Sequence, residues 1–112
     1  MKNKLHYSVD ARRDLEEIWD HIEGDLCSPV AARRMVDRIL DAVEQLENFS
    51  GLGAPLSSIV DTDTDYRFLV TGNYMTFYRV AGRDVYVDRI LYGRRDYLRV
   101  LFGRPDGDEL PQ

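Results

Sequence analysis

The sequence predicts an α+β fold: an N-terminal strand, a helical hairpin, an antiparallel β-meander and a short C-terminal helix. Three observations support this prediction. Apolar residues in the first half recur every three to four positions, as in helices, and those after residue 65 alternate, as in strands. The third is size, because 112 residues suffice for one domain with a single core. We therefore expect one domain over 1–112, with an ordered core of about 4–103 and a flexible tail over 104–112.

The first half is expected to form a strand over 4–7 and then two helices. Ser8 and Ser28 are suited to be N-cap residues, and Pro29 follows the second cap at the first helical position. Each helix has an apolar stripe, and the second helix should end near Asn48. The stripe residues are Leu15, Ile18, Trp19 and Ile22, then Ala32, Met35, Val36, Ile39, Leu40, Val43 and Leu46. Because few residues join the helices, they should pack antiparallel.

Three strands are expected after the polar, acidic loop over 57–65. They cover 66–71, 74–80 and 85–92, with turns at Gly72-Asn73 and 81–84. Short turns between consecutive strands require antiparallel pairing. Gly93 ends the last strand, and 94–102 favours one or two helical turns. We expect the hairpin to cover one face of the sheet and the other face to lack a cover of its own.

The charge is unevenly distributed along the chain. The formal charge is −5, yet residues 88–104 hold five arginines against two aspartates. The acidic balance argues against broad nucleic-acid binding, which needs a net basic face, but it allows one local basic site. No apolar run approaches the ~18 residues of a membrane span, and the polar N-terminus predicts no signal peptide. We therefore expect a cytoplasmic protein that has no membrane contact.

Cysteine and histidine are too few for a metal centre or an internal disulfide. Cys27 is the single cysteine, and His6 and His21 have no second ligand at metal spacing. The acidic run over 61–65 lacks the glycine and the closing glutamate of a calcium loop, so we interpret it as a solvated loop. The sequence therefore predicts no metal and no cofactor.

Tyrosines and arginines are interleaved along the meander and its exit. Six of the seven tyrosines lie there. The residues are Tyr66, Tyr74, Tyr78, Tyr86, Tyr92 and Tyr97, with Arg67, Arg79, Arg89, Arg94 and Arg95. A face of this composition can bind nucleic acid by stacking and phosphate contacts, or a protein through Tyr and Arg anchors.

The segments YRFLVTGNYMTFYRV (66–80) and VDRILYGRRDYLRVL (87–101), in this order of elements, resemble the RelE/ParE superfamily. Its members are the toxin halves of bacterial type II toxin–antitoxin operons. The resemblance covers about residues 4–102. It implies growth inhibition, plasmid stabilization and a cognate antitoxin as partner, in a toxin–antitoxin hetero-oligomer, with a homodimer as the other possible assembly.

The two branches of the superfamily have different targets. RelE-like members resemble ribonucleases that cut mRNA on the ribosome, whereas ParE-like members inhibit DNA gyrase. Arg67 and Arg95 match the RelE-like pattern, but Leu69 and Met75 stand where that pattern has basic residues, and Leu101 stands near its late tyrosine. The resemblance is therefore closer to ParE, and we expect a gyrase inhibitor and not an enzyme. The alternatives are a RelE-like mRNA endonuclease and a degenerate, non-toxic binding module.

Candidate site residues follow from the basic cluster and the resemblance. For target or antitoxin binding they are Arg67, Tyr78, Arg79, Arg94, Arg95 and Arg99. In a nuclease, Arg67 and Arg95 would neutralise phosphate and Tyr97 would transfer a proton, because arginine, with a pKa above ~12, is a poor base. Tyr97 can instead be a helix-to-core contact. The arginines of 94–99 can also pair with nearby acids on a solvated face.

The resemblance also leads to an expectation about the antitoxin. We expect its C-terminal segment, extended or helical, to lie over the tyrosine–arginine face and the helical hairpin and to fill the uncovered face of the sheet. Acidic side chains of that segment would then meet Arg67, Arg94 and Arg95.

Overall fold

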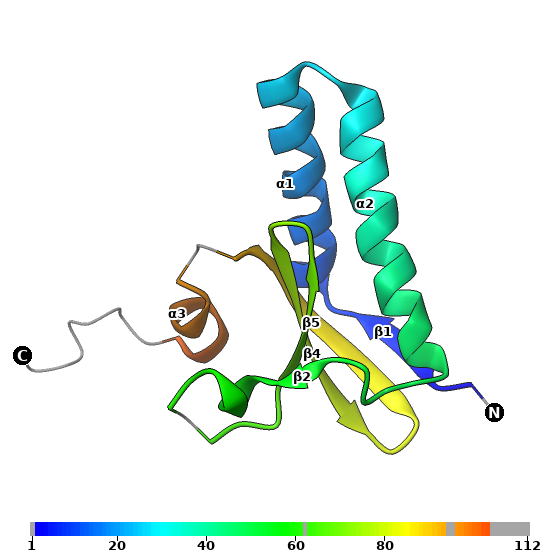
Figure 1. Cartoon of the computed structure of the whole chain (residues 1–112), viewed down its shortest axis with the longest axis vertical. Helices are drawn as coiled ribbons and strands as arrows, with labels where there is room; N and C mark the ends of the chain where they lie inside the picture. The colour runs from blue at the N-terminus through cyan, green and yellow to red at the C-terminus, as the bar shows by residue number, and fades with distance from the viewer. Residues whose placement is uncertain (1, 62, 94–95, 104–112) are drawn as a thin grey trace, which may run out of the picture.

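The computed structural model describes residues 2–61, 63–93 and 96–103. Its elements in chain order are β1 (Lys4–Tyr7), α1 (Val9–Leu26), α2 (Pro29–Glu44), the 3-10 turn η1 (Gln45–Glu47), β2 (Ala54–Pro55), the 3-10 turn η2 (Leu56–Ser58), β3 (Arg67–Thr71), β4 (Tyr74–Ala81), β5 (Asp84–Tyr92) and α3 (Tyr97–Phe102). The α+β fold class and the predicted order of elements are confirmed (Figure 1). The short strand β2 is an addition, because two residues, one of them a proline, give no alternating pattern.

Both helices of the hairpin begin at the predicted serine caps. The Ser8 hydroxyl accepts a hydrogen bond from the Ala11 N–H at 2.9 Å, and the Ser28 hydroxyl accepts one from the Ala31 N–H at 3.1 Å. α1 ends at Leu26, and the residue that follows, Cys27, has a left-handed φ of 50° that reverses the chain into α2. The two helices therefore form a tight hairpin, which extends beyond the end of the sheet (Figure 1).

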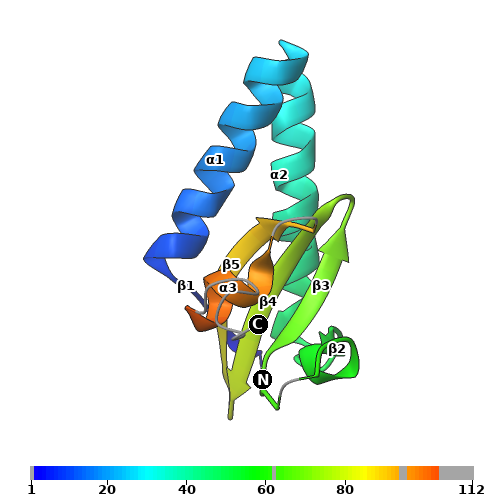
Figure 2. The same cartoon turned by 90° about the vertical axis from the view of Figure 1, so that its left-hand side faces the viewer.

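The sheet has five strands in the order β1-β5-β4-β3-β2 (Figure 2). β3, β4 and β5 pair antiparallel as predicted, whereas β1 pairs parallel to β5, so the sheet is mixed. No tight turn joins β1 to β5, and their relative direction was therefore not fixed by a turn. Phe77 pairs with Arg89 and Tyr78 with Val87, which leaves Asp88 unpaired in a β-bulge of β5.

The hairpin buries the main core against one face of the sheet. Apolar stripes of α1 and α2 pack on inward-facing residues of β3, β4 and β5. Fully buried members include Ala32, Ile39, Val43, Tyr78, Val85 and Val87. The helical stripes predicted from the sequence thus define the core, with Trp19 only partly buried at its edge.

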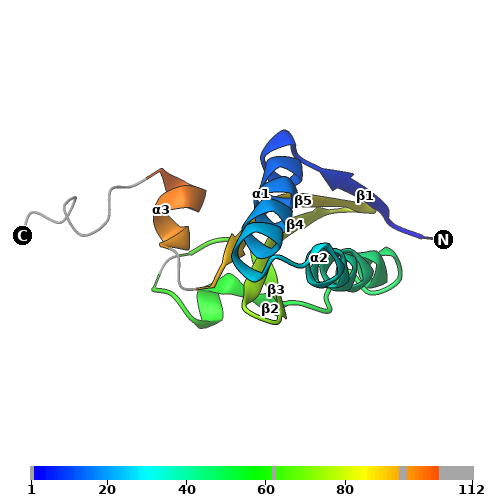
Figure 3. The same cartoon turned by 90° about the horizontal axis from the view of Figure 1, so that it is seen from above.

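The opposite face of the sheet is also covered, which corrects the expectation of an open face. A second apolar cluster is centred on Leu56, Met75, Phe77 and Leu91. It is covered by α3 and by the segment that follows β2, so that α2 and α3 lie on opposite sides of the sheet (Figure 3). These covers are too short to show a clear hydrophobic period, which is why the sequence did not reveal them. None of the helices in the described part of the chain has the length and apolar character to cross a membrane.

Candidate partner-binding groove

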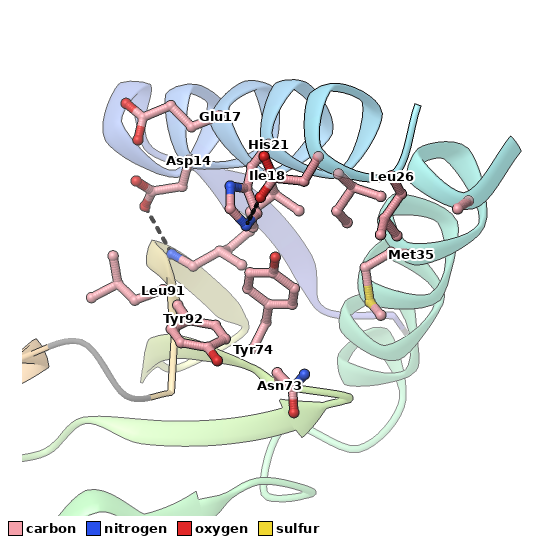
Figure 4. A pocket seen from close by; sticks show the side chains of 14 residues that line it. Asp14, Glu17, Ile18, His21, Leu26, Met35, Asn73, Tyr74, Leu91 and Tyr92 are labelled. Atoms are coloured by element: carbon pink, nitrogen blue, oxygen red, sulfur yellow. Dashed lines mark hydrogen bonds and ion pairs between the residues drawn. The ribbon is translucent and has the colours of Figure 1, made fainter. Parts of the chain in front are cut away.

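An open groove of about 830 Å³ lies between the outer half of α1, the start of α2 and the ends of β4 and β5. Figure 4 shows side chains of α1 and of the strands facing one another across it. Most of the lining is apolar and includes Ile18, Ile22, Leu26, Met35, Tyr74 and Ile90. No local sequence pattern predicts this groove, because its residues come from elements far apart in the chain.

The groove exists because the hairpin is longer than the sheet is tall. α1 has 18 residues and therefore a length of roughly 27 Å, so its second half extends beyond the ends of the strands. There the apolar stripe of α1 has no strand to cover it completely. Leu26 and Val30, where the helices join, are each 64% exposed. An apolar surface of this kind is typical of a protein-binding site.

Two parallel stripes of side chains run along α1 at the groove. Ile18, Ile22 and Leu26 form the apolar stripe, each four residues from the next. Glu17, His21 and Asp25 form the polar stripe beside it with the same spacing, and Asp14 precedes them. The His21 Nε2 lies 3.2 Å from a carboxylate oxygen of Asp25, and both side chains are largely exposed.

Asp14 stands where the groove meets the core and connects α1 to β5. Its side chain is 3% exposed. The Arg89 guanidinium donates to its two oxygens at 2.8 and 2.9 Å, and the Ile90 N–H donates to it at 2.9 Å. The hydrogen bond with Asp14 raises the pKa of Arg89. A bidentate pair of this type satisfies a buried carboxylate and fixes the orientation of α1 on the sheet.

Arg67 and Tyr78, both predicted to bind a partner, instead hold the loop over 50–53, an arrangement that we call the loop clamp. Arg67 donates to the carbonyl oxygens of Gly51 and Gly53 at 2.6–3.1 Å. The Tyr78 hydroxyl donates to the Ser50 carbonyl at 2.9 Å and accepts from the Gly53 N–H at 2.8 Å. Tyr78 is completely buried, so we correct its assignment from a binding residue to a structural one.

Arg79 lies in a second hydrogen-bonded cluster, around the bulge in β5. Its Nε donates to Asp88 at 2.8 Å, and its guanidinium lies 5.7 Å from the centre of the Tyr66 ring. The Tyr66 hydroxyl donates to the same Asp88 oxygen at 2.8 Å. Burial, and then the hydrogen bond to Asp88, raises the pKa of Tyr66 to about 12. The bulge therefore allows one carboxylate to bind two side chains.

The remaining predicted residues lie at or near α3. Tyr97 is partly buried and packs on Phe77, with ring centres 5.2 Å apart, which agrees with its interpretation as a core contact. Arg99 is exposed, and its backbone N–H donates to Asp96, the N-cap of α3. Arg94 and Arg95 lie outside the described residues. The structure thus places the described candidates in three separate clusters and not in one site.

The two apolar replacements, Leu69 and Met75, lie on opposite faces of the sheet. Leu69 belongs to the core under the hairpin, and Met75 belongs to the cluster under α3. Each is 9% exposed. A basic side chain at either position would have to be buried without a partner for its charge, which costs free energy.

These features define a small α+β protein with an open apolar groove and with strand arginines that donate hydrogen bonds to acceptors of the same chain. In the described part of the chain, no three His, Cys, Asp or Glu side chains converge as they would around a metal ion. The chain belongs to the ParE toxin family. Residues 5–97 match the family described as "ParE toxin of type II toxin-antitoxin system, parDE". The resemblance to the RelE/ParE superfamily, and its closeness to ParE, are confirmed.

Solved structures agree with this family assignment. A chain from the chromosomal ParDE toxin–antitoxin system of P. aeruginosa is 27% identical and superposes with a TM-score of 0.68, covering 81% of this chain and 96% of that one. A chain from the toxin–antitoxin complex RelBE2 of Mycobacterium tuberculosis has the same fold, at 17% identity and a TM-score of 0.58, covering 82% of this chain and 92% of that one. No curated protein sequence matches this chain.

Proposed function

We propose that this toxin stops bacterial growth by inhibiting DNA gyrase in the cytoplasm and that it acts by binding, not by cutting RNA. The family match over residues 5–97 carries the proposal. The arrangement of the strand arginines supports it. Arg67, Arg79 and Arg89 each donate to acceptors within the protein. Guanidinium groups held in this way are less available to neutralise the phosphate of a cleavage transition state.

The tyrosine chemistry also favours binding over cleavage. RNA cleavage through the 2′-OH needs a general acid and a base with pKa values near the working pH. The pKa of Tyr66 is raised to about 12, which makes its hydroxyl a weak proton donor at neutral pH. Tyr97, the other candidate, packs its ring on Phe77 in the second apolar cluster.

The natural partner that we propose is a cognate antitoxin bound in the groove. The apolar lining and the exposed Leu26 and Val30 support this assignment. In the sequence-based expectation, the antitoxin filled an uncovered sheet face. That face carries α3, whereas the groove is an apolar surface that remains open.

Expression of the chain without its partner tests the proposed function. Long filamentous cells with an induced DNA-damage response are expected, and the purified chain should inhibit gyrase supercoiling in vitro. Rapid arrest of protein synthesis with mRNA cuts, while supercoiling is unaffected, would overturn the proposal in favour of a ribosome-dependent nuclease. No effect on growth would indicate a non-toxic binding module.

Arg95→Ala tests the site that the family resemblance suggests. Arg95 lies outside the described residues, and its role remains a prediction. We expect the variant to lose toxicity and to keep the circular dichroism spectrum and melting temperature of the parent. Arg83→Ala, which removes an exposed arginine from the turn between β4 and β5, is the matched control and should remain toxic. A folded Arg95→Ala protein with full toxicity would refute the role.

A further inference from the structure

The charged side chains of the groove indicate what its occupant must carry. We propose that the groove binds an amphipathic helix that presents lysine or arginine side chains beside its apolar stripe. The inference rests on the proposed antitoxin partner and specifies the chemistry of its binding segment. It differs from the acidic segment that the sequence led us to expect on the arginine-rich side of the molecule.

The two stripes of α1 place negative charge beside the apolar lining of the groove. Ile18, Ile22 and Leu26 offer an apolar seam, and Glu17 and Asp25 flank it on the same helix. The carboxylate of Asp14 is neutralised by Arg89, so the uncompensated charge at the groove comes from the other two acids. No lysine or arginine occurs among the described lining residues. Charge complementarity therefore requires a cationic partner.

The second half of α1 as a whole is acidic. Residues 14–25 contain five acidic residues besides Asp14 and no lysine or arginine. The last turn of α1 has no basic residue, although the negative end of the helix dipole lies there. Carboxylates in this position raise the free energy of the unbound helix. A cationic partner would relieve that repulsion, whereas an acidic partner would increase it.

The spacing of the stripes suggests that the occupant is helical. Glu17 and Asp25 are eight residues apart and therefore separated by roughly 12 Å along the helix axis. Two basic residues about two turns apart on a partner helix match this separation. Apolar residues at i, i+3 and i+4 beside them would contact Ile22, Leu26 and Met35 in the groove.

Two labelled, alanine-based peptides of about 16 residues test the proposal, because shorter isolated helices are marginally stable. Both have the same leucine stripe, and the flanking positions are lysine in one and glutamate in the other. Fluorescence anisotropy with the purified full chain should give binding at least about tenfold tighter for the lysine peptide, with the difference shrinking in high salt. Equal binding, tighter binding of the glutamate peptide, or no binding of either would overturn the proposal.

Two double variants place the effect in the groove. Glu17→Lys with Asp25→Lys should reverse the preference between the peptides. Glu16→Lys with Glu23→Lys makes the same charge change on residues of α1 that do not line the groove, and it should leave the order of affinities unchanged. If both double variants had an equal effect, the preference for the lysine peptide would come from a general attraction to an acidic helix. The assignment of the peptide to the groove would then be refuted.

Other outcomes separate this inference from the proposed function. If sedimentation shows the chain alone to be a dimer that Leu26→Asp dissociates, the occupant is a second copy, and the proposal of a cationic helix fails. If the lysine peptide binds as expected but expression affects neither growth nor gyrase, then the inhibitor function is wrong while the groove assignment stands. If the chain inhibits gyrase but shows no preference between the peptides, the inhibitor function stands and the groove assignment is wrong.

Discussion

Two regions differ in how their charges are compensated: the base of the molecule, by which we mean the sheet and the segments packed on both of its faces, and the tip of the hairpin, residues 20–31. At the base, the buried carboxylate of Asp14 receives three hydrogen bonds from Arg89 and the backbone, and Asp88 receives two from side chains. At the tip, Asp20 and Glu23 have no basic residue in the last turn of α1 to offset them, and Asp25 meets only His21 among the described residues. Compensated charges hold the fold together, whereas uncompensated ones remain available to a partner.

The same contrast applies to apolar surface. Near the base, even short segments are used as covers: the segment after β2 and α3 bury Met75 and Phe77 almost completely. At the tip, Leu26 and Val30 are left exposed next to the groove. Exposed leucine and valine do not stabilise the free protein, so their presence beside an apolar groove is better explained by binding.

Removal of the carboxylate at the base should have the largest effect on stability. Asp14→Ala leaves Arg89 without its partner and the Ile90 N–H without an acceptor, and breaking a buried pair in this way costs about 3 kcal/mol or more in the free energy of unfolding. Urea denaturation measures the loss. Asp10→Ala removes a mostly exposed aspartate of the same helix and should cost about 0.5 kcal/mol. A loss below about 1 kcal/mol for Asp14→Ala would contradict the structural role of the pair.

A methyl group in the loop clamp should have the next largest effect. A Cβ on Gly53 would lie 2.5 Å from the Phe68 carbonyl oxygen and 2.7 Å from the Tyr78 hydroxyl. Because neither backbone nor a buried ring can move away easily, Gly53→Ala should cost about 1–3 kcal/mol. Gly51→Ala is the matched control, since a Cβ there meets nothing within 4 Å, and it should be nearly neutral. Equal stabilities of the two variants would refute the close packing of the clamp.

Alkaline pH should lower the free energy of unfolding through two tyrosines of this region, Tyr7 and Tyr66. Burial raises the pKa of Tyr66 and Tyr7 to about 12, above the value of 10.0 expected in the unfolded chain. The stabilisation from this difference is complete below about pH 10 and is lost as pH rises toward about 12, because the unfolded state releases these protons first. Urea denaturation between about pH 8 and about 11.5 measures the effect. The stability of the parent should fall more steeply with pH than that of the double variant Tyr66→Phe with Tyr7→Phe, because the variant lacks the two hydroxyls whose pKa differs between the folded and the unfolded state. Parallel curves would contradict the prediction.

The sequence predicted much of the fold and little of the site, for a physical reason. Serine caps, helical stripes and short turns are local signals, so the hairpin and the meander were predicted nearly residue by residue. The groove, the Asp14–Arg89 pair and the loop clamp join residues far apart in the chain, and no local pattern reveals them. Arg67 and Tyr78 were taken as binding residues because arginine and tyrosine serve both partner recognition and internal hydrogen bonding. Only burial and partners distinguish the two uses.

The smallest effect, and the one with the opposite sign, is expected at the tip. Glu23→Lys puts a cation in the last turn of α1, three residues after Asp20, where it favours the helix dipole and can form a pair. It should therefore stabilise the free protein by about 0.3–1 kcal/mol at low ionic strength, measured by urea denaturation. The gain should shrink in about 1 M salt, which screens exposed charges. A loss of stability would show that the acidic tip is compensated within the free protein, and the contrast with the base would no longer hold.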